Sequence, residues 1–149
     1  MVLEGFAVST TPTPPLGGVL ETALYVDDMP RARAFYEDVL GLKPMVEDSR
    51  LVAYPVAQGS VLLLFRRGST LAPVTLPGGV VPPHDGSGPL HMAFAIPAES
   101  LEAWAERLDR HGIPIESRVT WPKGGTSLYF RDPDGHALEL ATPGLWANY

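Results

Sequence analysis

The sequence predicts an α+β fold built from two βαβββ modules. An alternating strand, an amphipathic helix and three further strands occur twice in the same order, with an offset of about 70 residues. Residues 67–88, which are rich in proline and glycine, separate the two occurrences. A length of 149 residues is typical of a single domain, so we expect one domain made of two structurally repeated halves.

The first module, residues 19–66, has clear signals for both ends of its helix. Asp27 or Asp28 can cap the helix, Pro30 suits its first turn, and Gly41 ends it. The strands of this module are expected at 21–26, 44–47, 51–56 and 60–66.

The second module, residues 89–143, follows the same plan. Apolar residues recur every three or four positions between Leu101 and Leu108, which predicts a helix that ends at Gly112. The Asp-Pro-Asp-Gly sequence at 132–135 predicts a hairpin turn between the last two strands. The strands of this module are expected at 91–96, 115–120, 127–131 and 137–141.

Three segments fall outside the repeated pattern. We expect residues 1–18 to form a flexible N-terminal arm, 67–88 a long structureless linker, and 144–149 a C-terminal tail. The domain itself is therefore expected to span residues 19–143.

Composition excludes several classes of protein. The chain has no cysteine, which rules out disulfides, thiolate metal sites and a cysteine nucleophile. Its net charge of −6 and lack of a basic cluster disfavour binding to nucleic acid or to an anionic membrane surface. No apolar run is long enough for a membrane span and no signal peptide is evident, so we expect a cytoplasmic protein.

Three potential metal ligands occupy equivalent places on three of the predicted strands. Because side chains alternate along a strand, Glu21, His91 and Glu139 lie on the face away from the helices, among small residues. An unpaired carboxylate is costly to bury, so Glu139 in the middle of a strand favours a functional role. Such oxygen and nitrogen donors suit Mn²⁺, Fe²⁺, Ni²⁺, Co²⁺ or Zn²⁺.

Residues 24–42 read LYVDDMPRARAFYEDVLGL, and residues 130–140 read FRDPDGHALEL. These segments resemble the vicinal oxygen chelate superfamily, which includes glyoxalase I, extradiol dioxygenases, fosfomycin-resistance enzymes and bleomycin-binding proteins. The resemblance covers about residues 19–143. It implies that the modules form a curved mixed sheet around a concave site.

The resemblance also implies a divalent-metal-dependent enzyme. Glu21, His91 and Glu139 match the family's metal-ligand positions, although many members have His or Gln where Glu21 stands. A small oxygenated substrate would chelate the metal through two oxygens, and Glu21 or Glu139 would act as general base in a glyoxalase-like lyase or isomerase, or in a dioxygenase-like reaction. Leu63 stands where glyoxalase I carries a fourth, acidic ligand, which disfavours strict glyoxalase I activity, and the paired carboxylates disfavour extradiol cleavage.

Further side chains are expected to line the substrate site because they share faces with the ligand positions or adjoin them. Ser127 lies on one such face, and the predicted substrate-binding residues are Tyr25, Phe65, Arg67, Trp121, Tyr129 and Arg131. Of the other histidines, His84 is expected on the surface of the linker, His111 at a helix end, and His136 in a turn with a conformational role.

Two other functions compete with a metalloenzyme. One is a metal-free protein that sequesters a drug or metabolite, as bleomycin-binding members do, and the other is an interaction module without a ligand. Family analogy further implies a homodimer, in which the modules pair either within one chain or across two chains.

Overall fold

The computed structural model describes residue 5 and residues 11–149. Its first half forms one four-stranded sheet, the N-sheet, with the strand order β1-β4-β3-β2, and its second half forms another, the C-sheet, with the order β7-β10-β9-β8. The N-sheet strands are β1 (Glu21–Val26), β2 (Val46–Glu47), β3 (Leu51–Pro55) and β4 (Val61–Arg66). The C-sheet strands are β7 (His91–Ala95), β8 (Ser117–Thr120), β9 (Thr126–Arg131) and β10 (Ala137–Ala141).

Each sheet has the same internal pairing. The first strand of the module runs parallel to the last, and the remaining neighbours are antiparallel. The prediction of an α+β fold made of two βαβββ modules is therefore confirmed. Strands β1 and β7 each have a single hydrogen-bonded neighbour, so each lies at an edge of its sheet.

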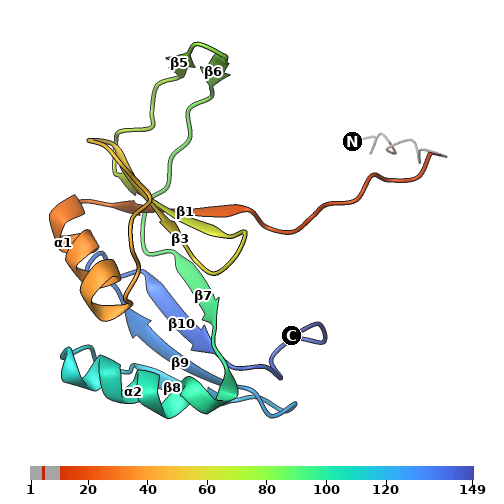
Figure 1. The fold of residues 1–149 in the computed structure, drawn as a ribbon, viewed down its shortest axis with the longest axis vertical. Helices are drawn as coiled ribbons and strands as arrows, with labels where there is room; N and C mark the ends of the chain where they lie inside the picture. The colour runs from red at the N-terminus through yellow and green to blue at the C-terminus, as the bar shows by residue number, and fades with distance from the viewer. Residues whose placement is uncertain (1–4, 6–10) are drawn as a thin grey trace.

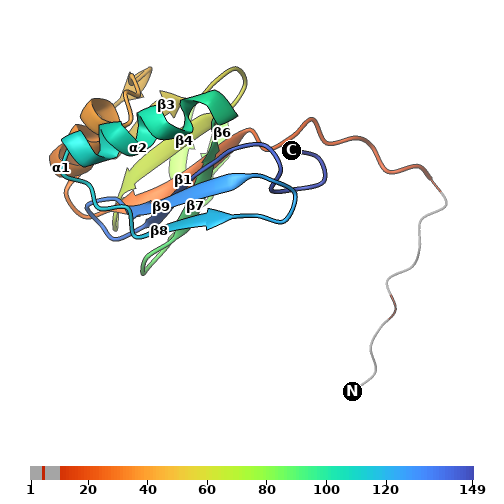
Figure 2. The ribbon, with the colours of Figure 1, turned by 90° about the horizontal axis from the view of Figure 1, so that it is seen from below.

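The helices begin and end where the local sequence signals indicated. Asp28 caps α1 (Met29–Ala34) by accepting a hydrogen bond from the backbone N–H of Arg31 at 3.1 Å. The π-helical segment η1 (Phe35–Val39) follows α1, and the 3₁₀ turn η2 (Ala98–Ser100) precedes α2 (Leu101–Arg110). In Figure 2 both α-helices lie on one side of the sheets, where they cover a continuous apolar core.

Residues 67–88 are more ordered than expected from their composition. They contain a hairpin of β5 (Val74–Leu76) and β6 (Gly79–Val81), which pair only with each other. The prediction of a structureless linker was wrong on this point, because the signals at Pro77 to Gly79 mark the turn of a hairpin and not an irregular loop. Figure 1 shows this hairpin projecting from the end of the molecule.

The expected N-terminal arm lies partly outside the described residues, at 1–4 and 6–10. Residues 11–20 are exposed and run away from the sheets in Figure 1. Among the described residues, no helix combines the length and apolar character needed to cross a membrane.

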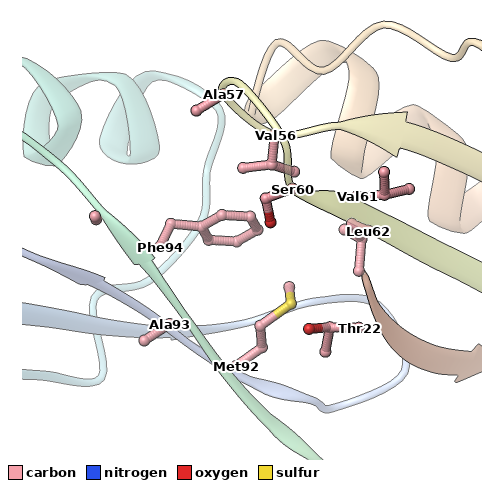
Figure 3. A pocket seen from close by; sticks show the side chains of 10 residues that line it. Thr22, Val56, Ala57, Ser60, Val61, Leu62, Met92, Ala93 and Phe94 are labelled. Carbon is pink, nitrogen blue, oxygen red and sulfur yellow. The ribbon is translucent and has the colours of Figure 1, made fainter. Parts of the chain in front are cut away.

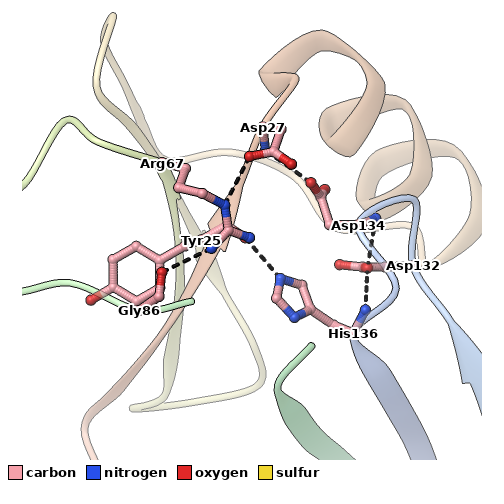
Figure 4. A network of polar contacts seen from close by, with 7 residues as sticks. All are labelled: Tyr25, Asp27, Arg67, Gly86, Asp132, Asp134 and His136. Atoms are coloured by element: carbon pink, nitrogen blue, oxygen red, sulfur yellow. Dashed lines mark hydrogen bonds and ion pairs between the residues drawn. The ribbon is translucent and has the colours of Figure 1, made fainter. Parts of the chain in front are cut away.

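The two modules are joined by buried polar contacts as well as by apolar packing. His136 is fully buried, accepts a hydrogen bond from the backbone N–H of Leu90 at Nδ1, and donates from Nε2 to the carbonyl of Tyr25, both at 2.8 Å. Figure 4 shows His136 and Tyr25 from this network together with Arg67, which also donates to the Tyr25 carbonyl, at 3.2 Å. The C-terminal end of β1 is therefore held to the turn that leads into β10.

Candidate functional site

The parallel pairing of β7 with β10 brings His91 and Glu139 together. In this register His91 lies opposite Ala137 and Ala93 lies opposite Glu139, so the two candidate ligands share one face of the C-sheet. Nε2 of His91 is 3.3 Å from Oε1 of Glu139. The alternation rule thus placed both side chains on the correct face.

The hydrogen bond of the other ring nitrogen of His91 determines which nitrogen carries the proton in the neutral ring. Nδ1 of His91 lies 2.8 Å from the carbonyl oxygen of Ala137, and a carbonyl oxygen can only accept, so Nδ1 carries a proton. In the neutral ring, Nε2 then presents a lone pair to the carboxylate oxygen of Glu139. A proton between these two acceptors, or a metal cation bound to both, would join them.

The Glu139 carboxylate is buried and held from its other oxygen. Only 4% of the residue is exposed, and Oε2 accepts a 2.5 Å hydrogen bond from the hydroxyl of Ser127. Trp121 in turn donates from its indole Nε1 to the Ser127 oxygen, at 2.8 Å. This chain of hydrogen bonds fixes the carboxylate so that Oε1 faces His91 and remains available.

Tyr129 completes this side of the C-sheet. It pairs with Glu139 across β9 and β10, and its ring stacks on that of His91 with centroids 6.3 Å apart. Burial raises the pKa of the Tyr129 hydroxyl, and the adjacent Glu139 carboxylate raises it further. Tyr129 and Arg131 also line a hollow of about 300 Å³ beside this pair.

These donors fit a divalent cation. An imidazole whose Nδ1–H is bound to a carbonyl and a carboxylate whose far oxygen is bound to a hydroxyl are the arrangement in which metal ligands are usually held. His91 is the more accessible of the two, since 55% of its side chain is exposed, whereas Glu139 forms the fixed floor.

Glu21 lies elsewhere in the same chain. It is exposed at the first position of β1, four residues before Tyr25, whose carbonyl accepts a hydrogen bond from His136 of the second module. Four residue steps along a strand separate these positions, which is roughly 13 Å. Within the described part of one chain, no three His, Asp or Glu side chains form a group that could hold a metal.

The face of the N-sheet that carries Glu21 also carries two of the predicted substrate residues. Tyr25 and Phe65 are opposite each other in the register of β1 and β4, and their rings stack with centroids 6.1 Å apart. His84 covers both: its Nδ1 is 2.6 Å from the Tyr25 hydroxyl, and its ring meets that of Phe65 edge-on at 4.8 Å. Leu63 lies on the same face, opposite Ala23, and supplies no ligand.

Two predicted substrate residues are engaged in internal contacts. Arg67 forms an ion pair with Asp27 at 2.8 Å and donates to the carbonyls of Tyr25 and Gly86. Arg131 forms an ion pair with Glu116 at 2.7 Å. Their roles in substrate binding stay predictions.

A separate apolar cleft of about 270 Å³ lies between the modules. Met92 and Phe94 of β7 line one side of it, and Thr22, Val56 and Leu62 line the other, as Figure 3 shows. Ala93 and Ala95, which alternate with Met92 and Phe94 along β7, line the cleft as well, so it runs along β7 and is lined from both faces of the strand.

Sequence reasoning missed two interactions. Ser127 was placed on the right face, but its hydrogen bond to Glu139 depends on the diagonal pairing of β9 with β10, which requires the register. His136 was assigned to a turn, and no local signal indicated that its ring joins the two modules.

Comparisons with known proteins agree with this architecture. A family model described as the glyoxalase/bleomycin resistance protein/dioxygenase superfamily matches residues 18–140. Metallothiol transferase FosB of Staphylococcus saprophyticus is 31% identical over 118 residues, which cover 78% of this chain and 71% of the relative. Lactoylglutathione lyase of Salmonella typhimurium is 29% identical, over 82% of this chain and 90% of that protein.

A solved structure resembles the whole fold. The crystal structure of lactoylglutathione lyase from Agrobacterium tumefaciens has a TM-score of 0.81 and 32% identity, and the match covers 90% of this chain and 99% of that one. The resemblance inferred from the motifs at 24–42 and 130–140 is thereby confirmed. The chain belongs to the glyoxalase/bleomycin resistance protein/dioxygenase superfamily.

Proposed function

We propose that the protein is a divalent-metal-dependent enzyme that acts on a small oxygenated organic substrate as a glyoxalase-like lyase or isomerase. The observation that carries this proposal is the 3.3 Å contact between Nε2 of His91 and Oε1 of Glu139, with Nδ1 of His91 committed to a carbonyl. The name of the metallothiol transferase relative supports metal dependence. Two carboxylates and one imidazole differ from the two-histidine, one-carboxylate set typical of oxygen activation, so a dioxygenase is less favoured.

The residues around Glu139 would keep its carboxylate in place. When bound, a Mn²⁺, Fe²⁺, Ni²⁺, Co²⁺ or Zn²⁺ ion supplies Lewis acidity to the substrate's oxygens. Ser127 holds Oε2 of Glu139, so Oε1 is the oxygen left to face the ligand or to hold a proton. Glu139 or Glu21 would act as general base, and Trp121 and Tyr129 would provide the wall against which the substrate is oriented.

We propose that Glu21 enters this site from a second copy of the chain. Within one chain Glu21 does not join His91 and Glu139, and the edge strands β1 and β7 each leave one side without a backbone partner. Edge strands of two copies can satisfy each other. A homodimer would therefore bring the Glu21 face of one copy to the His91–Glu139 face of the other.

The names of the relatives suggest thiol-linked substrates. Lactoylglutathione lyases, a glutathione transferase and a metallothiol transferase are all similar to this chain. A fosfomycin resistance protein of Listeria innocua, FosX, is also similar to part of this chain, with 41% identity over 51 residues. S-lactoylglutathione and fosfomycin with glutathione are therefore the first compounds to test for turnover, each with and without added metal.

Metal binding is the most direct test of the proposed function. Apo protein is titrated calorimetrically with Mn²⁺, Zn²⁺, Ni²⁺ and Co²⁺, using wild type, His91→Ala and the matched control His111→Ala, whose ring lies at the exposed end of α2. We expect wild type and the control to bind at least one ion with the same affinity, and His91→Ala to bind it about a hundredfold more weakly or not at all. Wild type without affinity for any of these ions would reject the proposal and favour a metal-free sequestering protein.

A further inference from the structure

The turn between β8 and β9 lies against residues 143–149, which we call the closing segment. Figures 1 and 2 both show the two side by side, at the end of the C-sheet where β10 finishes. The turn begins with Trp121, whose indole donates to the Ser127 hydroxyl that in turn binds Glu139. Whatever holds this turn in place therefore bears on the position of the buried carboxylate.

The turn itself, residues 121–125, is closed by two backbone hydrogen bonds. The N–H of Trp121 donates to the carbonyl of Gly125 at 2.7 Å, and the N–H of Gly124 donates to the carbonyl of Trp121 at 2.9 Å. Both bonds involve the backbone of Trp121, so a change in the shape of the turn changes the direction in which the Trp121 indole points.

Gly125 of the turn and Gly144 of the closing segment meet backbone to backbone. A Cβ at Gly144 would lie 2.6 Å from the nitrogen of Gly125 and 2.9 Å from the carbonyl oxygen of Lys123. A Cβ at Gly125 would lie 2.8 Å from the carbonyl carbon of Gly144. These neighbours are backbone atoms, which cannot move aside as a flexible side chain could, and Gly144 also has a φ of +103°. The contact therefore requires glycine at both positions.

The closing segment is attached to the end of β10, the strand that carries the buried carboxylate. The Tyr149 hydroxyl donates to the carbonyl of Ala141, the last residue of β10, at 2.7 Å. The N–H of Gly144 donates to the main-chain oxygen of Tyr149 at 2.9 Å, so the segment also closes on itself. Just before it, the Thr142 hydroxyl accepts a hydrogen bond from the N–H of Thr126, the first residue of β9, at 2.8 Å.

We propose that Gly144 and Tyr149 are positioning residues for the candidate metal site. They hold the β8–β9 turn in the conformation from which Trp121 reaches Ser127, and these two side chains then fix the carboxylate of Glu139. The inference rests on the proposed function for its effect on metal binding, but not for its effect on the Trp121 indole.

Gly144→Ala tests the contact between the segment and the turn. The added Cβ cannot fit against the turn, so the two must separate, and the Trp121 indole N–H should lose its hydrogen bond to Ser127. We expect its resonance to move upfield in a proton–nitrogen correlation spectrum, where Trp121→Phe identifies it among the three tryptophans of the chain. Gly112→Ala is the matched control and should leave the resonance in place, because Gly112 also has a positive φ, +69°, but has no atom within 4 Å of its Cβ position.

Calorimetric titration with an ion that wild type binds tests whether the segment acts through Ser127. Gly144→Ala alone should lower the metal affinity about tenfold. In a Ser127→Ala background the same substitution should lower it no further, because the hydroxyl through which the segment acts is already gone. A substitution that merely loosened the fold would add its own loss to that of Ser127→Ala.

Tyr149→Phe is a milder variant that removes one oxygen and adds no atom. It loses the hydrogen bond to the Ala141 carbonyl, so we expect a smaller upfield shift of the Trp121 indole and a metal affinity roughly threefold lower. Circular dichroism checks that each variant keeps its fold, and Tyr149→Phe supplies the test if Gly144→Ala does not fold.

The outcomes separate this inference from the proposed function. An unchanged Trp121 resonance in the folded variants, or a Gly144→Ala loss that adds fully to that of Ser127→Ala, overturns the inference and leaves the metal site standing. A wild-type chain without metal affinity rejects the proposed function, and the Trp121 resonance then still decides whether the closing segment positions the indole.

Discussion

The two sheets share one strand order but present different faces. The C-sheet buries a carboxylate, Glu139, and holds it with Ser127 and Trp121 beside an accessible His91. The N-sheet presents Glu21 at an exposed strand end, and on the same face Tyr25 and Phe65 form an aromatic cluster with His84. A repeated scaffold thus carries two different chemical surfaces.

This difference follows from a few positions along equivalent strands. Leu63 of β4 stands at the position that is equivalent to Glu139 of β10. The N-sheet therefore has no carboxylate at this position, and it needs no hydrogen bonds like those from Ser127 and Trp121 to hold one. At the place where β7 has His91, β1 has Glu21. We infer that the C-sheet is the fixed half of the site and the N-sheet the half that completes it.

Glu139→Gln tests the fixed half and should have the largest effect. The amide keeps the size of the side chain but removes the negative charge that faces Nε2 of His91, so metal affinity should fall roughly a hundredfold or more. Isothermal titration measures this fall. Glu106→Gln on α2 is the matched control, and equal losses in both variants would contradict a specific site.

His136→Ala tests the hydrogen bonds that connect the two modules. It removes the acceptor of the Leu90 N–H, leaves Arg67 as the side-chain donor to the Tyr25 carbonyl, and opens a cavity where a fully buried ring stood, which should lower the free energy of unfolding by about 3 kcal/mol. Urea denaturation followed by tryptophan fluorescence measures the change. His111→Ala, at an exposed position, should change stability little, and a similar small effect at His136 would show that the modules do not depend on this contact.

Ser127→Ala should have the smallest effect, because Ser127 acts through Glu139. Loss of the hydrogen bond to Oε2 frees the carboxylate to turn, and metal affinity should fall about tenfold while the fold is retained. Ser127→Thr keeps the hydroxyl and should recover most of the affinity in the same titration. If Thr and Ala behave alike, the hydroxyl does not position the carboxylate.

The sequence was enough to predict the two modules, because the patterns that mark their helices and strands are local. The alternation on β1, β7 and β10 gave the correct faces, and Asp28 and Gly41 marked the helix of the first module. The sequence did not predict the hairpin at 74–81, because its strands are short and prolines stand beside both of them. The separation of Glu21 from His91 could not be predicted, since it depends on how the two sheets pack.

Complementation between two inactive variants tests the division of the site most directly. Chains with Glu21→Ala and chains with His91→Ala are co-expressed under different tags, and the hybrid dimer is purified and titrated with metal beside both parents. The shared site predicts that each parent binds metal weakly, whereas the hybrid has one intact site per two chains and binds about half the wild-type amount. A hybrid no better than its parents, or a Glu21→Ala variant that binds as wild type does, would contradict a site shared between the N-sheet of one copy and the C-sheet of another.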